Sequence, residues 1–243
     1  MTRLLNGIVA FGSVLLLAVT LIGAGFAAVA IPDAATATLS RAFSGCDQPN
    51  TPFTADELAS MAIAGKHYTF DDNDREKLDA AIAEANAAAE ADGRTNALSR
   101  ESAARTLPTD AISHLDDVYR VASVAKPALV IVAVLCIAGL AHVAVRISRR
   151  ALGLTLMAGG GLVLAAFCAL GAWAAIDFDG LFAAFHSLFF QAGTWTFPYD
   201  SLLITLYPTA FWMGMGGIWL AVTCGLSILA VLIGFTLGHK QHD

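Results

Sequence analysis

Charged residues are scarce in this chain. Of its 243 residues only 14% are Asp, Glu, Lys or Arg, while 57% are hydrophobic. A soluble domain carries about 25% charged residues, so the composition excludes an ordinary water-soluble domain and indicates an integral membrane protein. The formal net charge of −6 argues against nucleic acid as a partner and gives no basic patch for anionic lipid headgroups.

Further absences narrow the class of protein. Cysteines aside, the only ionisable residue within the long hydrophobic stretches is His142, whereas transporters and pumps place ionisable groups near the bilayer midplane. Of the four cysteines only Cys46 lies outside these stretches, so we expect no internal disulfide. No G-x-S-x-G, HExxH or cofactor-binding motif is present, which leaves serine catalysis without support and indicates that no cofactor is needed.

Long apolar runs are what the chain has in abundance. A helix needs about 20 apolar residues to cross a bilayer, and four stretches qualify: Ile8–Ala30, Pro127–Val145, Leu152–Ile176 and Pro208–Leu237. The start of the first resembles a signal peptide, but the apolar part of a signal peptide has only about 7–15 residues. We therefore interpret it as an uncleaved anchor and predict an all-α integral membrane protein with four transmembrane helices.

Positive charges predict the orientation of these helices. Arg146, Arg149 and Arg150 lie between the second and third stretches, Arg3 precedes the first, and Lys240 follows the fourth. With four spans these sites all fall on one side of the membrane, and the positive-inside rule makes that side cytoplasmic. Both termini are then expected in the cytoplasm.

The predicted layout alternates membrane spans with outer and inner segments. It comprises residues 1–30 as the first transmembrane helix, 31–126 as an extracytoplasmic cap, 127–145 as the second transmembrane helix, 146–151 as a cytoplasmic loop, 152–176 as the third, 177–207 as an aromatic extracytoplasmic or interfacial loop, 208–237 as the fourth, and 238–243 as a cytoplasmic tail. We expect the cap to be mostly helical. Thr54 and Glu57 have capping-box spacing and predict one helix start, and Asp71–Ala91 predicts a second helix ending at Gly93.

A third helix is predicted at the end of the cap. Its apolar residues recur at spacings of three and four: Ile112, Leu115, Val118, Ala122 and Ala125. Ser113 and Asp116 suggest its N-cap, and Pro127 should stop it, because a residue before proline disfavours the helical region. His114 lies on this helix three residues before Asp117, whose carboxylate could orient the imidazole ring or raise its pKa.

The segment from Phe178 to Pro208 is unusually aromatic. It has a helical stripe made of Phe178, Leu181, Phe182, Phe185, Leu188 and Phe189. His186 follows Phe182 by four residues and precedes Phe190 by four, so these rings can flank it on a helix. Gly193 should end this helix, and Trp195 and Phe197 should lie in an extended segment. An interfacial aromatic belt is the simple alternative, but a belt uses mainly Trp and Tyr, and the Phe-rich stripe favours a pocket or a re-entrant element.

Two of the outer histidines are candidates for proton transfer. Burial of His186 among aromatic rings would lower its pKa and leave a neutral imidazole that accepts protons near pH 7. Together with His114 it would form an acid–base pair. A metal site using His114, Asp117, His186 and His67 is the rival use of the same residues.

These motifs resemble those of a known family. Four spans with an outer cap, the run from His114 to Val118, and the run from Phe185 to Phe197 followed by Tyr207-Pro208 are similar to the bacterial lipoprotein intramolecular transacylase family. The sequence separation of the two histidines is also similar. Leu115, where the family usually has Met, is a mild departure, and the cap before residue 110 matches only at Glu57 and Tyr68.

The resemblance implies an acyltransferase of the bacterial cell membrane. Its substrate would be the lipid-modified N-terminal cysteine of a lipoprotein, and its sn-2 acyl chain would move from the glyceryl oxygen to the α-amino group, giving a lyso-form lipoprotein. The family's two catalytic histidines map onto His114 and His186, with no metal and no cofactor. The substrate would contact membrane lipids and a pocket formed by Phe182, Phe185, Phe189, Phe190, Gly193, Trp195 and Phe197. The alternative is a non-enzymatic membrane protein whose aromatic loop binds lipid or a partner.

Overall fold

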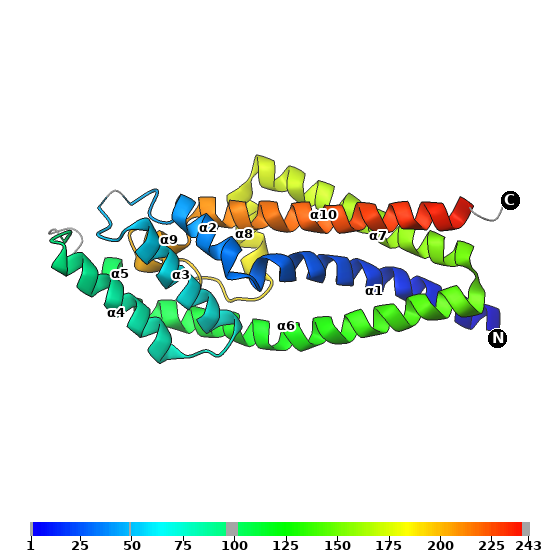
Figure 1. Cartoon of the computed structure of the whole chain (residues 1–243), viewed down its shortest axis with the longest axis horizontal. Helices are drawn as coiled ribbons and strands as arrows, with labels where there is room; N and C mark the ends of the chain where they lie inside the picture. Colours follow the sequence, from blue (N-terminus) through cyan, green and yellow to red (C-terminus); the bar gives the residue numbers. More distant parts are fainter. Residues whose placement is uncertain (1, 49, 96–101, 240–243) are drawn as a thin grey trace. The chain divides into compact units, whose positions relative to one another are not determined.

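The computed structural model describes residues 2–48, 50–95 and 102–239, and within them every regular element is a helix (Figure 1). In chain order the elements are α1 (Thr2–Ala30), α2 (Asp33–Phe43), α3 (Ala55–Phe70), α4 (Arg75–Ala91), α5 (Ser102–Arg105), α6 (Thr109–His142), the π-helix η2 (Val143–Ile147), α7 (Arg149–Ile176), α8 (Phe178–Ser187), α9 (Leu202–Leu206) and α10 (Thr209–His239). The all-α prediction is confirmed. Lys240, on which part of the orientation rests, lies outside the described residues.

The chain divides into two compact units. The first, here called the membrane unit, lies within residues 1–28, 125–177 and 218–243, and the second, the cap unit, comprises residues 29–124 and 178–217. Both histidines of the predicted acid–base pair belong to the cap unit. The two units are described separately below.

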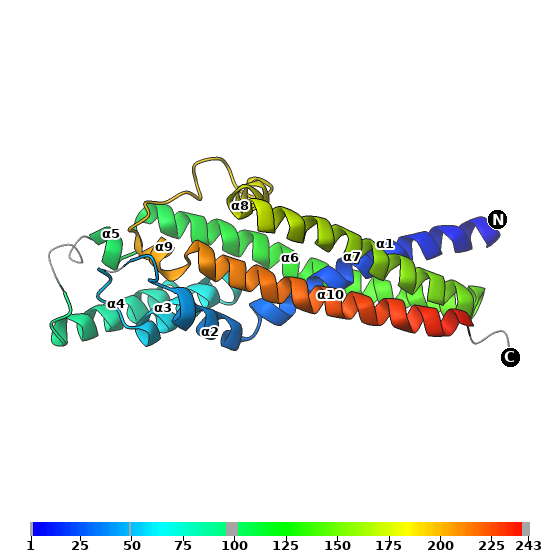
Figure 2. The same cartoon turned by 90° about the horizontal axis from the view of Figure 1, so that it is seen from above.

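The membrane unit is built from parts of the four long helices. Among the described residues, four helical segments are long and apolar enough to cross a membrane: Thr2–Ala30, Ala103–Ile147, Arg149–Ile176 and Thr209–His239. They contain the four predicted stretches except for Pro208, which lies just before the last segment. In both views α1, α6, α7 and α10 lie roughly along one axis in this unit, with consecutive helices of the four antiparallel (Figures 1 and 2). Their buried contacts include Leu17, Cys136, Val163 and Phe167, while Ile8, Ile137 and Ile176 are exposed, as expected for side chains that face lipid.

Glycine allows two of these helices to approach closely. A Cβ atom added at Gly153 of α7 would lie 2.5 Å from the carbonyl oxygen of Gly234 of α10, and one added at Gly234 would lie 2.5 Å from the carbonyl oxygen of Gly153. Neither backbone can yield as a flexible side chain would, so the contact requires the absence of a side chain at both positions. Gly160 packs in the same way against the backbone of Ser227, whereas Gly161 faces open space.

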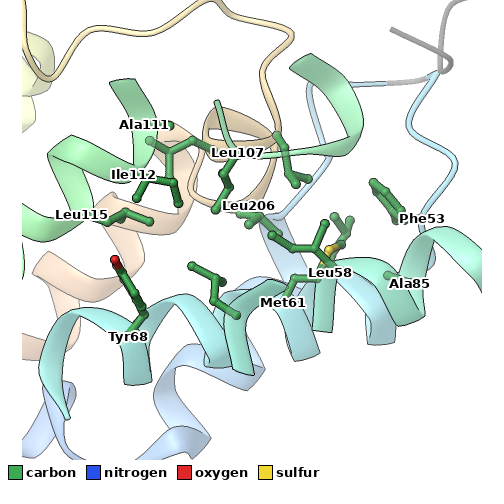
Figure 3. Close-up of a cluster of buried hydrophobic side chains, with 14 of the residues drawn as sticks. Phe53, Leu58, Met61, Tyr68, Ala85, Leu107, Ala111, Ile112, Leu115 and Leu206 are labelled. Atoms are coloured by element: carbon green, nitrogen blue, oxygen red, sulfur yellow. The ribbon is translucent and has the colours of Figure 1, made fainter. Parts of the chain in front are cut away.

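The cap unit has a hydrophobic core of its own. Leu58, Met61 and Tyr68 of α3 face Ala111, Ile112 and Leu115 of α6 (Figure 3). The capping box predicted at the start of α3 is confirmed, since the Thr54 amide donates to Glu57 Oε2 and the Glu57 amide donates to Thr54 Oγ1. The predicted apolar face of α4 is confirmed as well, with Leu78, Ile82 and Ala85 buried, and the segment after it turns at Gly93, which has a positive φ of 65°.

Three predicted helix boundaries are wrong. The helix carrying His114 neither begins at Ser113 nor stops before Pro127: α6 starts at Thr109 and continues through the proline. An interior proline costs about 3 kcal/mol, and burial of Ala111, Ile112 and Leu115 before it, together with the long apolar run after it, offsets that cost. The helix carrying His186 ends earlier than predicted, at Ser187 rather than near Gly193.

The early end of α8 has a visible cause. After Ser187 the Phe189 and Phe190 amides both donate to the His186 carbonyl oxygen, at 3.1 and 2.9 Å. This tightening ends the helix, and the chain then turns through Gly193, which has φ +87°. The apolar stripe is also less buried than predicted, because Phe185, Leu188 and Phe189 are all exposed.

Candidate active site

His114 lies in the second turn of α6 and is buried, with 8% of its surface exposed. Its ring is in contact with Phe190, at a centroid distance of 5.0 Å, and with Phe197, at 5.6 Å. The Nδ1 atom is buried and has no hydrogen-bond partner among the described residues. A buried polar atom without a partner costs about 1–3 kcal/mol, and no protein group of the described residues competes for this nitrogen.

His186 lies in the last turn of α8, and the backbone fixes its tautomer. Its Nδ1 atom is 2.9 Å from the carbonyl oxygen of Phe182. A carbonyl oxygen only accepts hydrogen bonds, so Nδ1 carries the proton and Nε2 keeps its lone pair. Burial lowers the pKa of this imidazole below its ordinary value, since the charged form loses hydration. The result is a neutral ring with a free acceptor, the state that a general base requires.

The two histidines come together as predicted. Their ring centroids are 6.2 Å apart and their planes are inclined by 29°. No direct hydrogen bond joins the two rings among the bonds of the described residues, and the separation leaves room for a reacting group to contact both. This proximity follows from α6 and α8 packing within the cap unit, and the two histidines are far apart in the sequence.

Aromatic rings surround this pair. Phe190 contacts both histidines, at 5.0 Å from His114 and 5.7 Å from His186. Phe182 and Trp195 lie 4.0 and 4.8 Å from His186, and Phe185 meets the same ring edge-on at 5.8 Å. The structure thus brings five of the seven predicted pocket residues against a histidine: Phe182, Phe185, Phe190, Trp195 and Phe197.

The other two predicted pocket residues stand apart from the histidines. Phe189 contacts Phe185 and Phe190, at 5.3 and 6.2 Å, without any ring contact to a histidine. Gly193 has no neighbour within 4 Å of the place where a side chain would begin. Its role is in the backbone turn, and it makes no contact that would form part of a pocket wall.

The structure shows a different partner for Asp117 than the sequence suggested. Its carboxylate accepts a hydrogen bond from Nη1 of Arg120 at 2.7 Å, and Nδ1 of His114 has no partner. The carboxylate held by hydrogen bonds from other elements of the cap unit is that of the neighbouring Asp116. It accepts from the hydroxyl of Tyr68 at 2.5 Å and from the amide of Asn73 at 3.4 Å.

The contact between Tyr68 and Asp116 ties the His114 helix to α3. Burial and the nearby Asp116 raise the pKa of Tyr68 to about 12, so its hydroxyl is a donor at every physiological pH. Asp116 lies two residues after His114, so the hydrogen bond fixes the turn that carries the histidine. Sequence reasoning did not assign a role to this pair. The available signal was Tyr68, which matched the family in a cap that otherwise did not.

The rival metal site does not assemble in this structure. His67 binds Asp33 through Nε2 at 2.9 Å, and Asp117 pairs with Arg120. In the part of the chain that the structure describes, no three His, Cys, Asp or Glu residues are grouped so that they could hold a metal ion. His67 and Asp117 therefore have partners of their own, apart from the His114–His186 pair.

A pocket of about 420 Å³ adjoins the histidine pair. It is lined by Asp117, Arg120, Val121, Phe189, Phe190, Gln191 and Thr194. Phe190 belongs both to this lining and to the contacts of His114 and His186. Its ring therefore forms a wall between the pocket and the acid–base pair.

Comparison with known families decides the class of this protein. Residues 90–212, a segment that contains His114, His186 and the aromatic loop, match the model of the family described as lipoprotein intramolecular transacylase Lit. The chain belongs to the lipoprotein intramolecular transacylase family. It is therefore a multi-pass membrane enzyme of the acyltransferase class that acts on lipoproteins, and these predictions are confirmed.

Solved structures of a transacylase from Bacillus cereus share the fold. The chain is 17% identical to the membrane integral lipoprotein intramolecular transacylase Lit from that organism, with a TM-score of 0.72 over 98% of this chain and 97% of the other. Two mutants of the Bacillus protein, with a histidine replaced by alanine or by arginine, give TM-scores of 0.69 and 0.66 at the same identity, over 99% of this chain and 96% and 95% of theirs. No curated protein matches the chain.

Proposed function

We propose that this transacylase moves the sn-2 acyl chain of a diacylglyceryl-modified lipoprotein to the α-amino group of its N-terminal cysteine, giving a lyso-form lipoprotein. The observation that carries the proposal is the pairing of a buried histidine, His114, with the partly buried His186, at a ring-centroid distance of 6.2 Å and inside one aromatic cluster. Membership of the transacylase family supports the reaction class, and the chemistry of the pair supports this particular transfer.

The amine must lose a proton before it can attack. An α-amino group has a pKa near 8, so most of it is protonated at pH 7. Its neutral form attacks the ester carbonyl carbon: the new C–N bond forms, and the π electrons move to the carbonyl oxygen. Nε2 of His186 then takes a proton from the nitrogen, because its lone pair is free and its neutral form is favoured by burial.

The leaving glyceryl oxygen needs the proton that the base has taken. When the tetrahedral intermediate collapses, the C–O bond breaks and its electrons go to the glyceryl oxygen. We assign His114 as the acid–base partner: the proton taken by Nε2 of His186 passes to the unpaired Nδ1 of His114, which then delivers it to the glyceryl oxygen, so that both rings end neutral. The two rings hold one additional proton between them during the reaction, since apolar surroundings disfavour two charged imidazoles 6.2 Å apart.

The aromatic cluster completes the chemistry by excluding water. The nucleophile and the ester belong to one substrate molecule, so the enzyme needs no serine or cysteine nucleophile. Holding the two groups in contact can supply several kcal/mol. Phe182, Phe190 and Trp195 surround the base and keep away the water that would otherwise hydrolyse the ester.

The proposal includes the location of the reaction. In this proposal the short connection that carries Arg146, Arg149 and Arg150 lies in the cytoplasm together with both termini, and the positive-inside rule supports that orientation. The cap unit, with the histidine pair, then lies on the extracytoplasmic face of the bacterial cell membrane, where lipoproteins carry their lipid-modified N-terminus. The segment boundaries predicted from the sequence belong to the same proposal.

The test is expression in a bacterium whose lipoproteins keep a free N-terminus, with mass spectrometry of their N-terminal lipopeptides. The wild-type chain should produce lyso-form lipopeptides, and His186→Ala and His114→Ala should abolish them. His67→Ala is the matched control, because that histidine is also in the cap unit but binds Asp33, and it should retain the product. Unchanged lipopeptides with well-expressed wild-type protein would overturn the proposal and favour a lipid-binding role for the exposed apolar face of α8.

A further inference from the structure

The indole nitrogen of Trp195 is buried without a hydrogen-bond partner. It is one of five such side-chain atoms among the described residues. An indole N–H is only a donor and cannot change its protonation state. Leaving it unpaired costs about 1–3 kcal/mol, and buried polar atoms are so regularly paired that each exception calls for an explanation.

The position of Trp195 suggests what the missing partner is. Its ring lies 4.8 Å from His186 and 6.5 Å from Phe182, in the loop between α8 and α9. Of the five unpaired atoms, two belong to residues that contact His186, namely Trp195 and His114. Both residues thus have an unpaired polar atom and a ring in contact with the proposed base, where a bound substrate can pair with that atom.

Nearby hydroxyl groups are already engaged. The Ser187 hydroxyl donates to the Ala184 carbonyl at 2.7 Å, and the Thr194 hydroxyl donates to the Gln191 carbonyl at 2.9 Å. Each satisfies its own backbone turn. The indole N–H of Trp195, by contrast, is a side-chain donor beside His186 that has no acceptor among the described residues.

The acyl transfer requires such a donor. Attack of the amine converts the ester carbonyl into a tetrahedral centre whose oxygen carries a full negative charge, and an aromatic cluster offers that charge little hydration. Donors aimed at a developing oxyanion usually supply the largest single part of catalysis in acyl transfer. His114 is needed for the proton of the leaving oxygen, so a non-titrating N–H is the suitable second group.

We propose that Nε1–H of Trp195 donates a hydrogen bond to the carbonyl oxygen of the migrating acyl group and stabilises the oxyanion of the tetrahedral intermediate. This inference rests on the proposed acyl transfer. The hydrogen bond forms as the C–N bond forms and is released when the C–O bond breaks, so it consumes no proton and no co-reactant. Trp195 becomes a catalytic residue in addition to the two histidines.

Phe190 links the pocket to the histidine pair. The pocket of about 420 Å³ is lined by Phe190, whose ring also contacts both histidines. Phe190 and Trp195 both lie on the loop that follows α8, most of which is exposed.

The test is Trp195→Phe, which removes the donor and keeps an aromatic ring. We expect kcat to fall by about 10²–10³-fold, the loss typical of one oxyanion donor, with KM for a defined diacylglyceryl lipopeptide and the pH profile changed little. Trp219→Phe is the matched control, since the Trp219 indole donates to the Ile22 carbonyl at 3.1 Å in the membrane unit, and its kcat should stay within about twofold of wild type.

A second replacement guards against a folding defect. Benzothienylalanine at position 195 preserves the bicyclic ring and substitutes sulfur for N–H, and it should lose the same activity. Full kcat with either replacement would overturn the oxyanion role. If the wild-type chain makes no lyso-form lipopeptide, the proposed function itself is overturned. If the His114 and His186 variants are inactive but Trp195→Phe is fully active, only this inference is overturned.

Discussion

Removal of the Tyr68 hydroxyl is a direct test of how His114 is held. In the structure this hydroxyl donates to Asp116, two residues after His114, at 2.5 Å. Tyr68 is 4% exposed, and its ring lies in the core between α3 and α6 (Figure 3). Tyr68→Phe keeps the ring and removes only the hydrogen bond.

The size of the effect follows from the setting. A hydrogen bond to a charged acceptor contributes about 1.5–3 kcal/mol. Asp116 is only half-buried and keeps Asn73 as a second donor, so water and Asn73 compensate in part and we expect about 1.5 kcal/mol. For a chain of this size that corresponds to a fall in the thermal midpoint of roughly 3–6 °C. A shift of the histidine by about 1 Å can cost up to 10²-fold in rate, so we expect kcat to fall by about tenfold.

The assay combines thermal unfolding in detergent with turnover of a defined lipopeptide. Tyr199→Phe is the matched control: the Tyr199 hydroxyl is also a donor, but its acceptor is the backbone carbonyl of Asp47, at 3.0 Å, and the side chain is 63% exposed. The control should shift the midpoint by less than about 2 °C and leave kcat unchanged. Equal behaviour of the two variants would refute the idea that the Tyr68–Asp116 contact positions His114.

Two further predictions concern the base and the membrane unit. Burial lowers the pKa of His186, so its neutral form persists below pH 6.5, the ordinary histidine pKa. The acidic side of the kcat/KM profile should therefore contain two limbs, one near pH 8 from the substrate amine and one below about pH 6.5 from the base. A base limb between these two values would contradict the assignment. Gly153→Ala should lower the thermal midpoint, because the new Cβ would lie 2.5 Å from the Gly234 carbonyl oxygen, whereas Gly161→Ala, facing open space, should raise it slightly through the better helix propensity of alanine, worth about 1 kcal/mol. The Gly153 interpretation fails if both variants melt alike.

Strong local and compositional signals predicted much of the fold. The long apolar runs located the four membrane helices, and the capping box at Thr54 and the stripe at Leu78, Ile82 and Ala85 located α3 and α4. Each of these depends on residues close together in sequence. The prediction that the helix stops before Pro127 failed because tertiary packing on both sides of the proline outweighs the free-energy cost of a proline inside a helix. That packing depends on residues distant in the sequence and cannot be predicted from the residues around Pro127.

The sequence predicted which residues form the candidate site, but not which contacts those residues make. Motif resemblance identified His114, His186 and most of the aromatic rings. It could not distinguish Asp116 from Asp117, since which of two adjacent carboxylates faces α3 depends on the rotation of α6 about its axis. The unpaired indole nitrogen of Trp195 is equally invisible in the sequence, because a missing partner is a property of the folded surroundings.

The hydrogen bond from Nδ1 of His186 to the Phe182 carbonyl has a consequence for how this enzyme can vary. The carbonyl belongs to the main chain, so every amino acid at position 182 supplies it as long as α8 stays helical. The side chain at that position lies 4.0 Å from the imidazole and can change with the shape of the acyl chain. Mutation of residue 182 therefore leaves the proton on Nδ1 of His186, because the carbonyl that accepts its hydrogen bond remains. The side chain at this position can vary with the acyl chain while the tautomer of the base stays the same.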